Sequence, residues 1–188
     1  MNSLKEIYDK LCKQGYETDK GSVHSYIDVF EEILEPYRER AINILEIGIF
    51  KGNSLRMWTE YFNGTVYCVD CDIKPHGGMA DLTDMVNSGE WNIKIFDATN
   101  IELVKQNFEG IKFDVIIEDA GHDIGQQVVL YNVYKNYLSE GGIYIIEDVQ
   151  DIDKTKNIFE NLDNSKEISI FDLRNKKGRY DDVLIIIQ

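Results

Sequence analysis

Five short apolar runs, each followed by a longer stretch of mixed polarity, constrain the fold of this chain more than any other feature. The runs are rich in Ile, Val, Tyr and Phe, which is typical of parallel strands buried on both faces. They cover residues 43–49, 65–70, 91–97, 113–119 and 142–148. Apolar side chains recur at helical spacing in the segments between them, over residues 53–62, 100–108 and 126–138. The alternation predicts a Rossmann-like, doubly wound α/β fold with helices on both faces of a mostly parallel sheet.

The two ends of the chain depart from this alternation. Residues 167–173 and 183–187 have the composition of strands. The polar segment 174–178 between them is predicted to be a turn, so the two strands are expected to be joined without a helix. We therefore expect seven strands with a C-terminal antiparallel hairpin, so that the sheet ends with one antiparallel strand. The glycine pair at 141–142 is expected to stop the preceding helix. Residues 1–40 look helical and are predicted to pack on a single domain that covers residues 1–188.

Charge and composition exclude several classes of protein. The 188 residues include 20 Lys and Arg against 34 Asp and Glu, a formal net charge of -14. Such a surface repels phosphate backbones, so a nucleic-acid partner is not expected. No apolar run approaches the roughly 20 residues that span a bilayer. Three cysteines without a signal peptide point to a cytoplasmic protein. We expect a small-molecule partner and no membrane, and a homo-oligomer is left open.

The first predicted strand leads into a glycine loop that is typical of nucleotide-like cofactors. The loop runs from Glu46 through Gly48 to Gly52, and Gly48 lets the backbone approach a ligand closely. Asp70 ends the next strand, at the spacing of about 20 residues where a carboxylate can accept the hydroxyls of a ribose. A dinucleotide site needs G-x-G-x-x-G, whereas this loop is E-x-G-x-x-x-G. The spacing therefore favours S-adenosylmethionine over NAD.

Acidic side chains end the fourth and fifth predicted strands. Asp119 ends one strand, and Glu147 and Asp148 end the next, about one βαβ unit later. Neighbouring strands lie about 4.8 Å apart, so these carboxylates are expected to converge. Converging carboxylates repel one another, and a hard divalent cation such as Mg²⁺ relieves the repulsion. The competing interpretation of a single Asp at a strand end is a helix cap or a solvated turn. His122 lies three residues beyond Asp119 and can face the same pocket, and histidine is suited to take a proton from a hydroxyl near neutral pH.

Several segments together resemble a known family. They are the Thr18-Asp19-Lys20 motif with His24 and Tyr26, the stretch LEIGIFKGNSLRMWTEYF at residues 45–62, and the strand ends VYCVD, EDAGH and IYIIED. In these segments the chain resembles class I S-adenosylmethionine-dependent methyltransferases, and among them the metal-dependent sugar O-methyltransferases of macrolide biosynthesis, of the mycinamicin and macrocin type. The family reads Asp-Asp-Gly-Ser-His where this chain reads Glu-Asp-Ala-Gly-His.

The resemblance implies a role for each matching residue. It implies that Asp119, Glu147 and Asp148 hold Mg²⁺ and that His122 is the general base. The residues that it places at the cofactor are Lys20, Tyr26, Glu46, Gly48, Asp70, Asp97 and Asp119. The implied activity is Mg²⁺-assisted methyl transfer from S-adenosylmethionine to a hydroxyl of a small molecule, most readily a sugar or a sugar nucleotide. Two alternatives stay open: an NAD-dependent oxidoreductase, and a non-catalytic partner subunit that binds S-adenosylmethionine.

Overall fold

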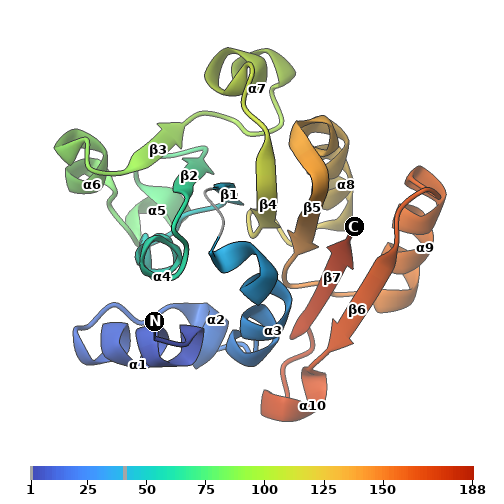
Figure 1. Cartoon of the computed structure of the whole chain (residues 1–188), viewed down its shortest axis with the longest axis horizontal. Helices are drawn as coiled ribbons and strands as arrows, with labels where there is room; N and C mark the ends of the chain where they lie inside the picture. The colour runs from blue at the N-terminus through green and yellow to red at the C-terminus, as the bar shows by residue number, and fades with distance from the viewer. Residues whose placement is uncertain (1, 40–41) are drawn as a thin grey trace.

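A seven-stranded sheet forms the centre of the computed structural model (Figure 1), which describes residues 2–39 and 42–188, with the backbone alone at residue 76. Its strands are β1 (Asn43–Ile47), β2 (Thr65–Asp70), β3 (Asn92–Ile95), β4 (Phe113–Glu118), β5 (Leu138–Ile146), β6 (Ile168–Asp172) and β7 (Val183–Ile187). The helices are α1 (Leu4–Lys13), α2 (Asp19–Ser22), α3 (Ile27–Arg38), α4 (Asn53–Tyr61), α5 (Pro75–Gly78), α6 (Thr83–Ser88), α7 (Ile101–Phe108), α8 (Ile124–Tyr134), the 3₁₀ turn η1 (Lys135–Tyr137), α9 (Ile152–Leu162) and α10 (Arg174–Lys177).

The strand order in the sheet is β3-β2-β1-β4-β5-β7-β6. The strands β1 to β5 pair in parallel, and β7 runs antiparallel to both β5 and β6. From β1 to β3 successive strands are added on one side of β1, and β4 is added on its other side, so the strand order reverses between β1 and β4. In open α/β sheets a ligand binds beyond the strand ends at such a switch point. The fold therefore places the ends of β1, β2, β4 and β5 at the edge where a site is expected.

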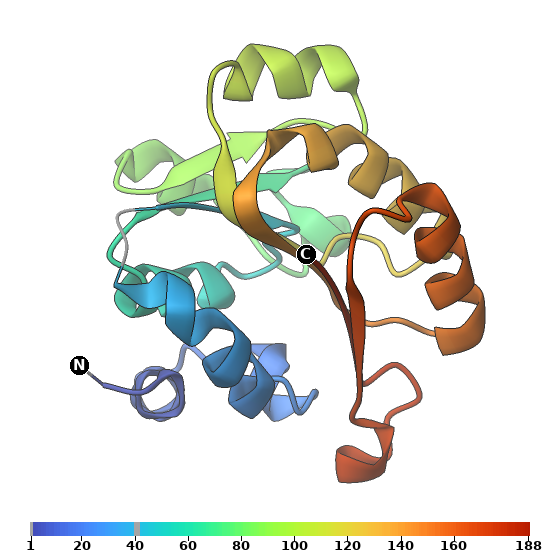
Figure 2. The ribbon, with the colours of Figure 1, turned by 45° about the vertical axis from the view of Figure 1, so that its right-hand side comes forward.

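Helices cover both faces of the sheet, and each face has its own core. The helices α1, α3 and α4 pack on one face, and α7, α8 and α9 pack on the other (Figure 2). Alternate residues of the strands serve the two cores, so Ile44 belongs to the first and Leu45 to the second. Because both faces of the sheet are covered, β1, β4 and β7 are buried over nearly their whole length.

Side-chain caps define where several helices begin. Ser3 and Glu6 form a capping box at the start of α1, and the side chain of Asn100 accepts hydrogen bonds from the first turn of α7. Asp123 caps α8 and Asp151 caps α9 in the same way. The caps of α8 and α9 fix how the chain leaves β4 and β5, directly after the acidic strand ends.

The structure confirms the predicted doubly wound, mostly parallel seven-stranded sheet and its C-terminal antiparallel hairpin. The prediction that Gly141 and Gly142 stop a helix is wrong, because α8 ends at Tyr134 and β5 starts at Leu138. The pairing of β4 with β5 jumps from Phe113 opposite Leu138 to Val115 opposite Ile143, so the glycines form an irregularity within the strand.

Two further expectations about the C-terminal region are corrected. The turn expected at 174–178 contains the one-turn helix α10, which Gly178 ends in a left-handed conformation. The sheet does not end with its antiparallel strand, since β7 inserts between β5 and β6 and leaves β6 at the edge. The helices α5, α6 and α9 were not predicted. The first residue and the last residue of the predicted 1–40 segment lie outside the described residues, which place α1, α2 and α3 there.

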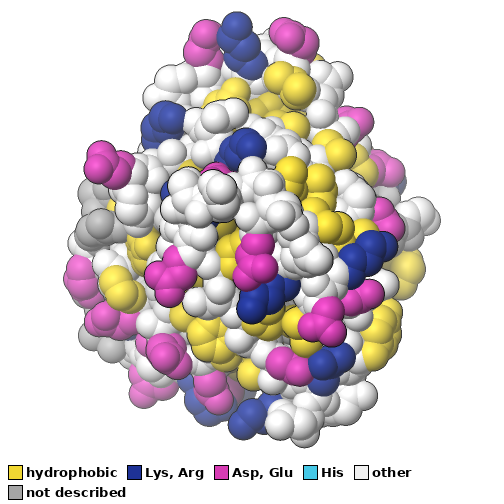
Figure 3. Space-filling model, turned by 90° about the vertical axis from the view of Figure 1, so that its right-hand side faces the viewer, with side chains coloured by type: hydrophobic (Ala, Val, Ile, Leu, Met, Phe, Trp, Pro, Cys, Tyr) yellow, Lys and Arg dark blue, Asp and Glu magenta, His cyan; other side chains and the backbone are white. Residues whose placement is uncertain are grey.

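The surface seen from the right-hand side of Figure 1 mixes both signs of charge. Acidic, basic and hydrophobic side chains alternate over it, so the net negative charge is not gathered on this face (Figure 3). None of the helices among the described residues is long and apolar enough to cross a bilayer.

Candidate active site

A cavity of about 670 Å³ opens at the ends of β1, β2 and β4. This volume lies within the range of about 300–1,000 Å³ that is usual for small-molecule sites. The predicted site residues on its wall are Gly48, Asp70, Asp97, Asp119 and His122. The residues Thr18, Asp19, Ser22 and Val23 line its opposite side, so α2 and its flanks wall the cavity in. The cavity therefore lies between the strand ends and the N-terminal segment.

Gly48 lies at the closest backbone approach in the cavity wall. Its φ is 99°, and a Cβ built there would overlap the carbonyl oxygen of Asp119. The neighbouring strand ends are joined by backbone hydrogen bonds, from the Asp119 amide to the Ile47 carbonyl (2.9 Å) and from the Gly48 amide to the Val69 carbonyl (2.8 Å). Only a residue without a side chain lets the loop after β1 pass the loop after β4 at this separation.

Asp70 holds the glycine loop in place while lining the cavity. Its Oδ2 accepts the amides of Ile49 (2.9 Å) and Phe50 (3.4 Å), and its Oδ1 accepts the amide of Asp72 (3.2 Å). Asp97, on the same wall, accepts both the amide and the hydroxyl of Thr99, and these hydrogen bonds lower the pKa of its carboxyl. Both carboxylates are positioned from within the protein and still border the cavity.

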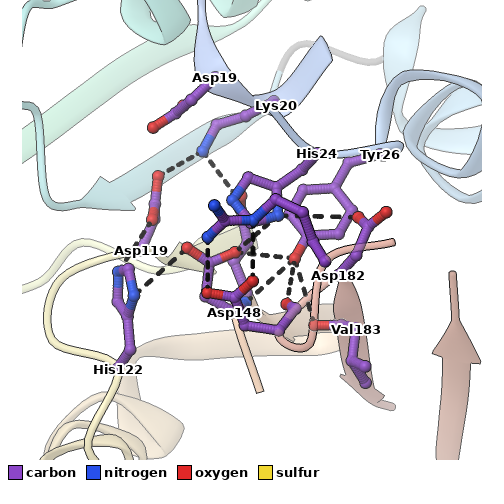
Figure 4. Close-up of polar contacts among 12 residues, drawn as sticks. Asp19, Lys20, His24, Tyr26, Asp119, His122, Asp148, Asp182 and Val183 are labelled. Atoms are coloured by element: carbon purple, nitrogen blue, oxygen red, sulfur yellow. Dashed lines mark hydrogen bonds and ion pairs between the residues drawn. The ribbon is translucent and has the colours of Figure 1, made fainter. Parts of the chain in front are cut away.

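Asp119, His122 and Asp148 form the centre of the site (Figure 4). One ligand atom from each lies within 4.8 Å of the others. The His122 Nδ1 is 3.4 Å from the Asp148 Oδ2, and its Nε2 is 3.9 Å from the Asp119 Oδ1. Burial raises the pKa of Asp148, and the charge of His122 opposes that rise. The side chain of His122 is 39% exposed, so it can meet a molecule in the cavity.

Lys20 provides a buried positive charge behind this centre. Its Nζ lies 2.5 Å from Asp119, 2.7 Å from Glu147 and 3.4 Å from Glu46. Burial lowers the pKa of the Lys20 ammonium, but the three carboxylates outweigh burial and raise it well above its usual range. Burial also raises the pKa of Asp119 and Glu147, and the Lys20 charge opposes that rise. Lys20 therefore stays charged and compensates a set of carboxylates that would otherwise repel one another.

Five of the predicted site residues do not line the cavity, and one of them, Asp148, lies beside His122, which does. Glu46 is fully buried and accepts hydrogen bonds from Ser54 Oγ (2.9 Å) and Trp58 Nε1 (3.1 Å). The Tyr26 hydroxyl lies 2.7 Å from the Asp148 Oδ1. The five residues that do not line the cavity are Lys20, Tyr26, Glu46, Glu147 and Asp148.

His24 and Glu118 add two polar contacts that the sequence did not assign a role. The His24 Nδ1 lies 3.3 Å from Asp148, and burial lowers the pKa of its imidazole. The sequence signal that could have pointed to His24 is its place just after the Thr18-Asp19-Lys20 motif. Burial raises the pKa of Glu118 to about 8, and the hydrogen bond that one of its oxygens accepts from the Ala120 amide opposes that rise. Its Oε2 has no hydrogen-bond partner among the described residues. Nothing in the sequence separates Glu118 from its neighbour Asp119.

The centre fits a divalent cation on its chemistry. Asp119 and Asp148 offer one carboxylate oxygen each from the adjacent strand ends of β4 and β5, and a ring nitrogen of His122 lies beside them. Mg²⁺ binds proteins through one or two carboxylates and completes its shell with water or substrate oxygens. Glu147 remains a predicted ligand; in this structure one of its oxygens pairs with Lys20.

A family of methyltransferase domains matches residues 45–149, more than half of the chain. The chain belongs to this family, and the predicted resemblance is confirmed. The match covers β1 to β5, the strands whose ends carry the cavity and the acidic centre.

Individual relatives are O-methyltransferases by name. A tetracenomycin-C rhamnosyl 2'-O-methyltransferase of Streptomyces olivaceus is 30% identical over 148 residues, 71% of this chain and 35% of the relative. Demethylmacrocin O-methyltransferase of Streptomyces fradiae is 29% identical over 155 residues, 78% of this chain and 37% of the relative. The chain thus spans about a third of the length of these relatives.

The solved structures support the same fold. The MycE methyltransferase of the mycinamycin pathway, solved in complex with Mg, SAH and mycinamycin VI, superposes with a TM-score of 0.71 at 18% identity. The superposition covers 100% of this chain and 54% of MycE. At this identity the comparison establishes the shared methyltransferase fold.

Proposed function

We propose that this chain is an S-adenosylmethionine-dependent, Mg²⁺-assisted O-methyltransferase that acts on a hydroxyl of a sugar or a sugar-bearing small molecule. The proposal treats residues 1–188 as one catalytic domain. The observation that carries it is the convergence of Asp119, His122 and Asp148 within 4.8 Å, beside a cavity bordered by a glycine loop. The family match and the named substrates of the relatives support the choice of reaction and of acceptor.

The walls of the cavity divide into two functional parts in this proposal. Gly48, Asp70 and Asp97 bind the cofactor, with the Asp70 carboxylate beside the ribose and Asp97 near the adenine. Lys20, Tyr26 and Glu46 support this pocket from behind its wall. Asp119, Glu147 and Asp148 are the residues that would hold Mg²⁺, and oxygens of water or of the acceptor would complete its shell.

The chemistry requires a proton to leave the acceptor hydroxyl as its oxygen takes the methyl group. When bound, S-adenosylmethionine supplies an electrophilic methyl group and Mg²⁺ lowers the pKa of a bound hydroxyl. His122 is held by Asp148 through Nδ1, which leaves Nε2 to take the hydroxyl proton. The new carbon–oxygen bond forms as the carbon–sulfur bond breaks, and the sulfur keeps the bonding electron pair. The cavity walls hold the two reactants in line.

Replacing His122 tests this assignment directly. We expect His122→Ala to lower the rate of Mg²⁺-dependent methyl transfer to a panel of sugar acceptors by about 10²–10⁴-fold, because the general base is lost. We expect the affinity for S-adenosylhomocysteine, measured by titration calorimetry, to change by less than about twofold, since the side chain lies at the acceptor side. A variant with full activity would remove His122 from the mechanism. Wild-type protein that binds S-adenosylhomocysteine and methylates no acceptor would favour the non-catalytic alternative.

A further inference from the structure

We propose that Tyr26 is a positioning residue that orients Asp148, so that one carboxylate oxygen of Asp148 is fixed inside the protein and only Oδ2 is presented to the metal centre. The inference rests on the proposed Mg²⁺ site and deepens it, because it assigns how the ligand is held. It places Tyr26 beside the metal ligand and behind the residues that line the cavity.

The Tyr26 hydroxyl contacts the side chain and the backbone of the same residue. It donates to the Asp148 Oδ1 at 2.7 Å and accepts the Asp148 amide at 3.3 Å. The Asp181 carbonyl lies 3.0 Å from the same hydroxyl, but a phenol has one proton, and the shorter contact goes to the carboxylate. Tyr26 is fully buried, so water does not compete for these hydrogen bonds.

Asp148 needs such support because its backbone is unusual. Its φ is 56°, and the only other residue besides glycine with a positive φ among the described residues is Phe50. Side-chain-bearing residues hold this conformation only where their surroundings impose it. The Tyr26 hydroxyl bonds both the backbone amide and the side-chain carboxylate of Asp148. These two contacts restrict rotation about the N–Cα bond, the bond that φ describes.

The Tyr26 ring is itself fixed. It stacks on the His24 ring at a centroid distance of 4.8 Å and meets the Phe30 ring edge-on at 6.0 Å. The hydroxyl therefore has a defined position with respect to β5, and Figure 4 shows it directed at Asp148 from the opposite side to His122.

Asp119 is held in a parallel arrangement. Its Oδ2 contacts Lys20 at 2.5 Å, and its Oδ1 is the oxygen on the side of His122. Each of the two carboxylates thus gives one oxygen to a buried residue of the N-terminal segment and one to the centre. Each ligand can then bind Mg²⁺ through a single oxygen, which leaves coordination positions for the acceptor and water.

The Tyr26→Phe variant tests the inference while keeping the ring and its packing. We expect the Kd for Mg²⁺, measured by calorimetry on protein saturated with S-adenosylhomocysteine, to rise about 10–100-fold, the usual effect of losing a residue that orients a metal ligand. The Kd for S-adenosylhomocysteine in metal-free buffer should stay within about twofold. The matched control is Tyr37→Phe in α3, the helix whose N-cap is Tyr26. The Tyr37 hydroxyl donates to the Gly141 carbonyl in β5, away from the centre, so its loss should leave both values unchanged.

A second measurement does not depend on the variant. A crystal structure of the wild-type protein with Mg²⁺ and S-adenosylhomocysteine should show Asp148 bound through Oδ2 alone, with Oδ1 still on Tyr26. Equal Mg²⁺ affinity in Tyr26→Phe and wild type, or bidentate binding by Asp148, would overturn the inference and leave the proposed methyl transfer intact. If wild type binds Mg²⁺ more tightly than Tyr26→Phe but methylates no hydroxyl, the proposed function fails and the positioning role stands.

Discussion

At the scale of single residues, the site depends on a few positions whose geometry admits one residue type. Gly48 is the clearest, because its φ of 99° and the adjoining Asp119 carbonyl each exclude a side chain. The same close approach brings the ends of β1 and β4 together and so places Asp119 on the cavity wall. The position of the acidic centre therefore depends on the conformation of the glycine loop.

The Gly48→Ala variant tests the cost of the positive φ and of the close approach to the Asp119 carbonyl. We expect the free energy of unfolding to fall by about 2–5 kcal/mol, from about 1–2 kcal/mol for the left-handed backbone and about 1–3 kcal/mol for overpacking. The control is Gly110→Ala, which has a φ of 77° but meets nothing within 4 Å and should lose only about 1–2 kcal/mol. Chemical denaturation of both variants gives the two values. Equal losses would show that the Asp119 carbonyl moves aside at little cost.

At the scale of elements, the short helix α2 depends on a distant part of the chain. The Lys177 Nζ, at the end of α10, donates to the backbone carbonyls of Gly21, Ser22 (3.3 Å) and His24 (2.7 Å). A four-residue helix is too short to be stable alone. The hairpin between β6 and β7 therefore helps to hold the cavity wall that α2 forms.

Lys177→Met should weaken the cofactor site without touching it. We expect the Kd for S-adenosylhomocysteine to rise about tenfold, since a charged hydrogen bond contributes about 1.5–3 kcal/mol and part of it orders α2. Lys176→Met is the matched control from the same turn of α10, where the described residues show no bond from Lys176 to α2, and its Kd should be unchanged. Calorimetry measures both, and equal Kd values in the two variants would show that α2 is ordered without the Lys177 contact.

At the scale of the whole molecule, the cavity occupies the point where the strand order reverses, and both cores converge behind it. A ligand that binds such a site binds only the folded protein, so its binding raises the global stability. The sheet order is also compatible with nucleotide cofactors in general. The thermal stability of the protein with each cofactor can therefore distinguish a methyltransferase from an NAD-dependent oxidoreductase.

Thermal unfolding with two ligands makes that distinction. S-adenosylhomocysteine at about 100 times its Kd stabilises the folded state by about 2.7 kcal/mol. For a domain of this size, that corresponds to a rise in Tm of about 5–10 °C. We expect NAD at the same concentration to give no rise. A rise with NAD and none with S-adenosylhomocysteine would favour the oxidoreductase.

The sequence by itself determined the fold class and most of the candidate site. Apolar runs report burial on both faces of a strand, so β2 and β7 were predicted to the residue. The acids at the ends of β4 and β5 were found because parallel strands end at one edge. These features are local, and a short stretch of chain is enough to specify them.

Only the tertiary structure decided which carboxylate oxygen faces which partner. Lys20 and Tyr26 precede Asp119 and Asp148 by 99 and 122 positions, and no local pattern links residues so far apart. The position of β7 inside the sheet also lies beyond local reasoning, because strand order depends on which edges remain unpaired once the other strands are in place. The sequence could therefore predict the chemical groups of the site, while long-range packing alone set their orientation.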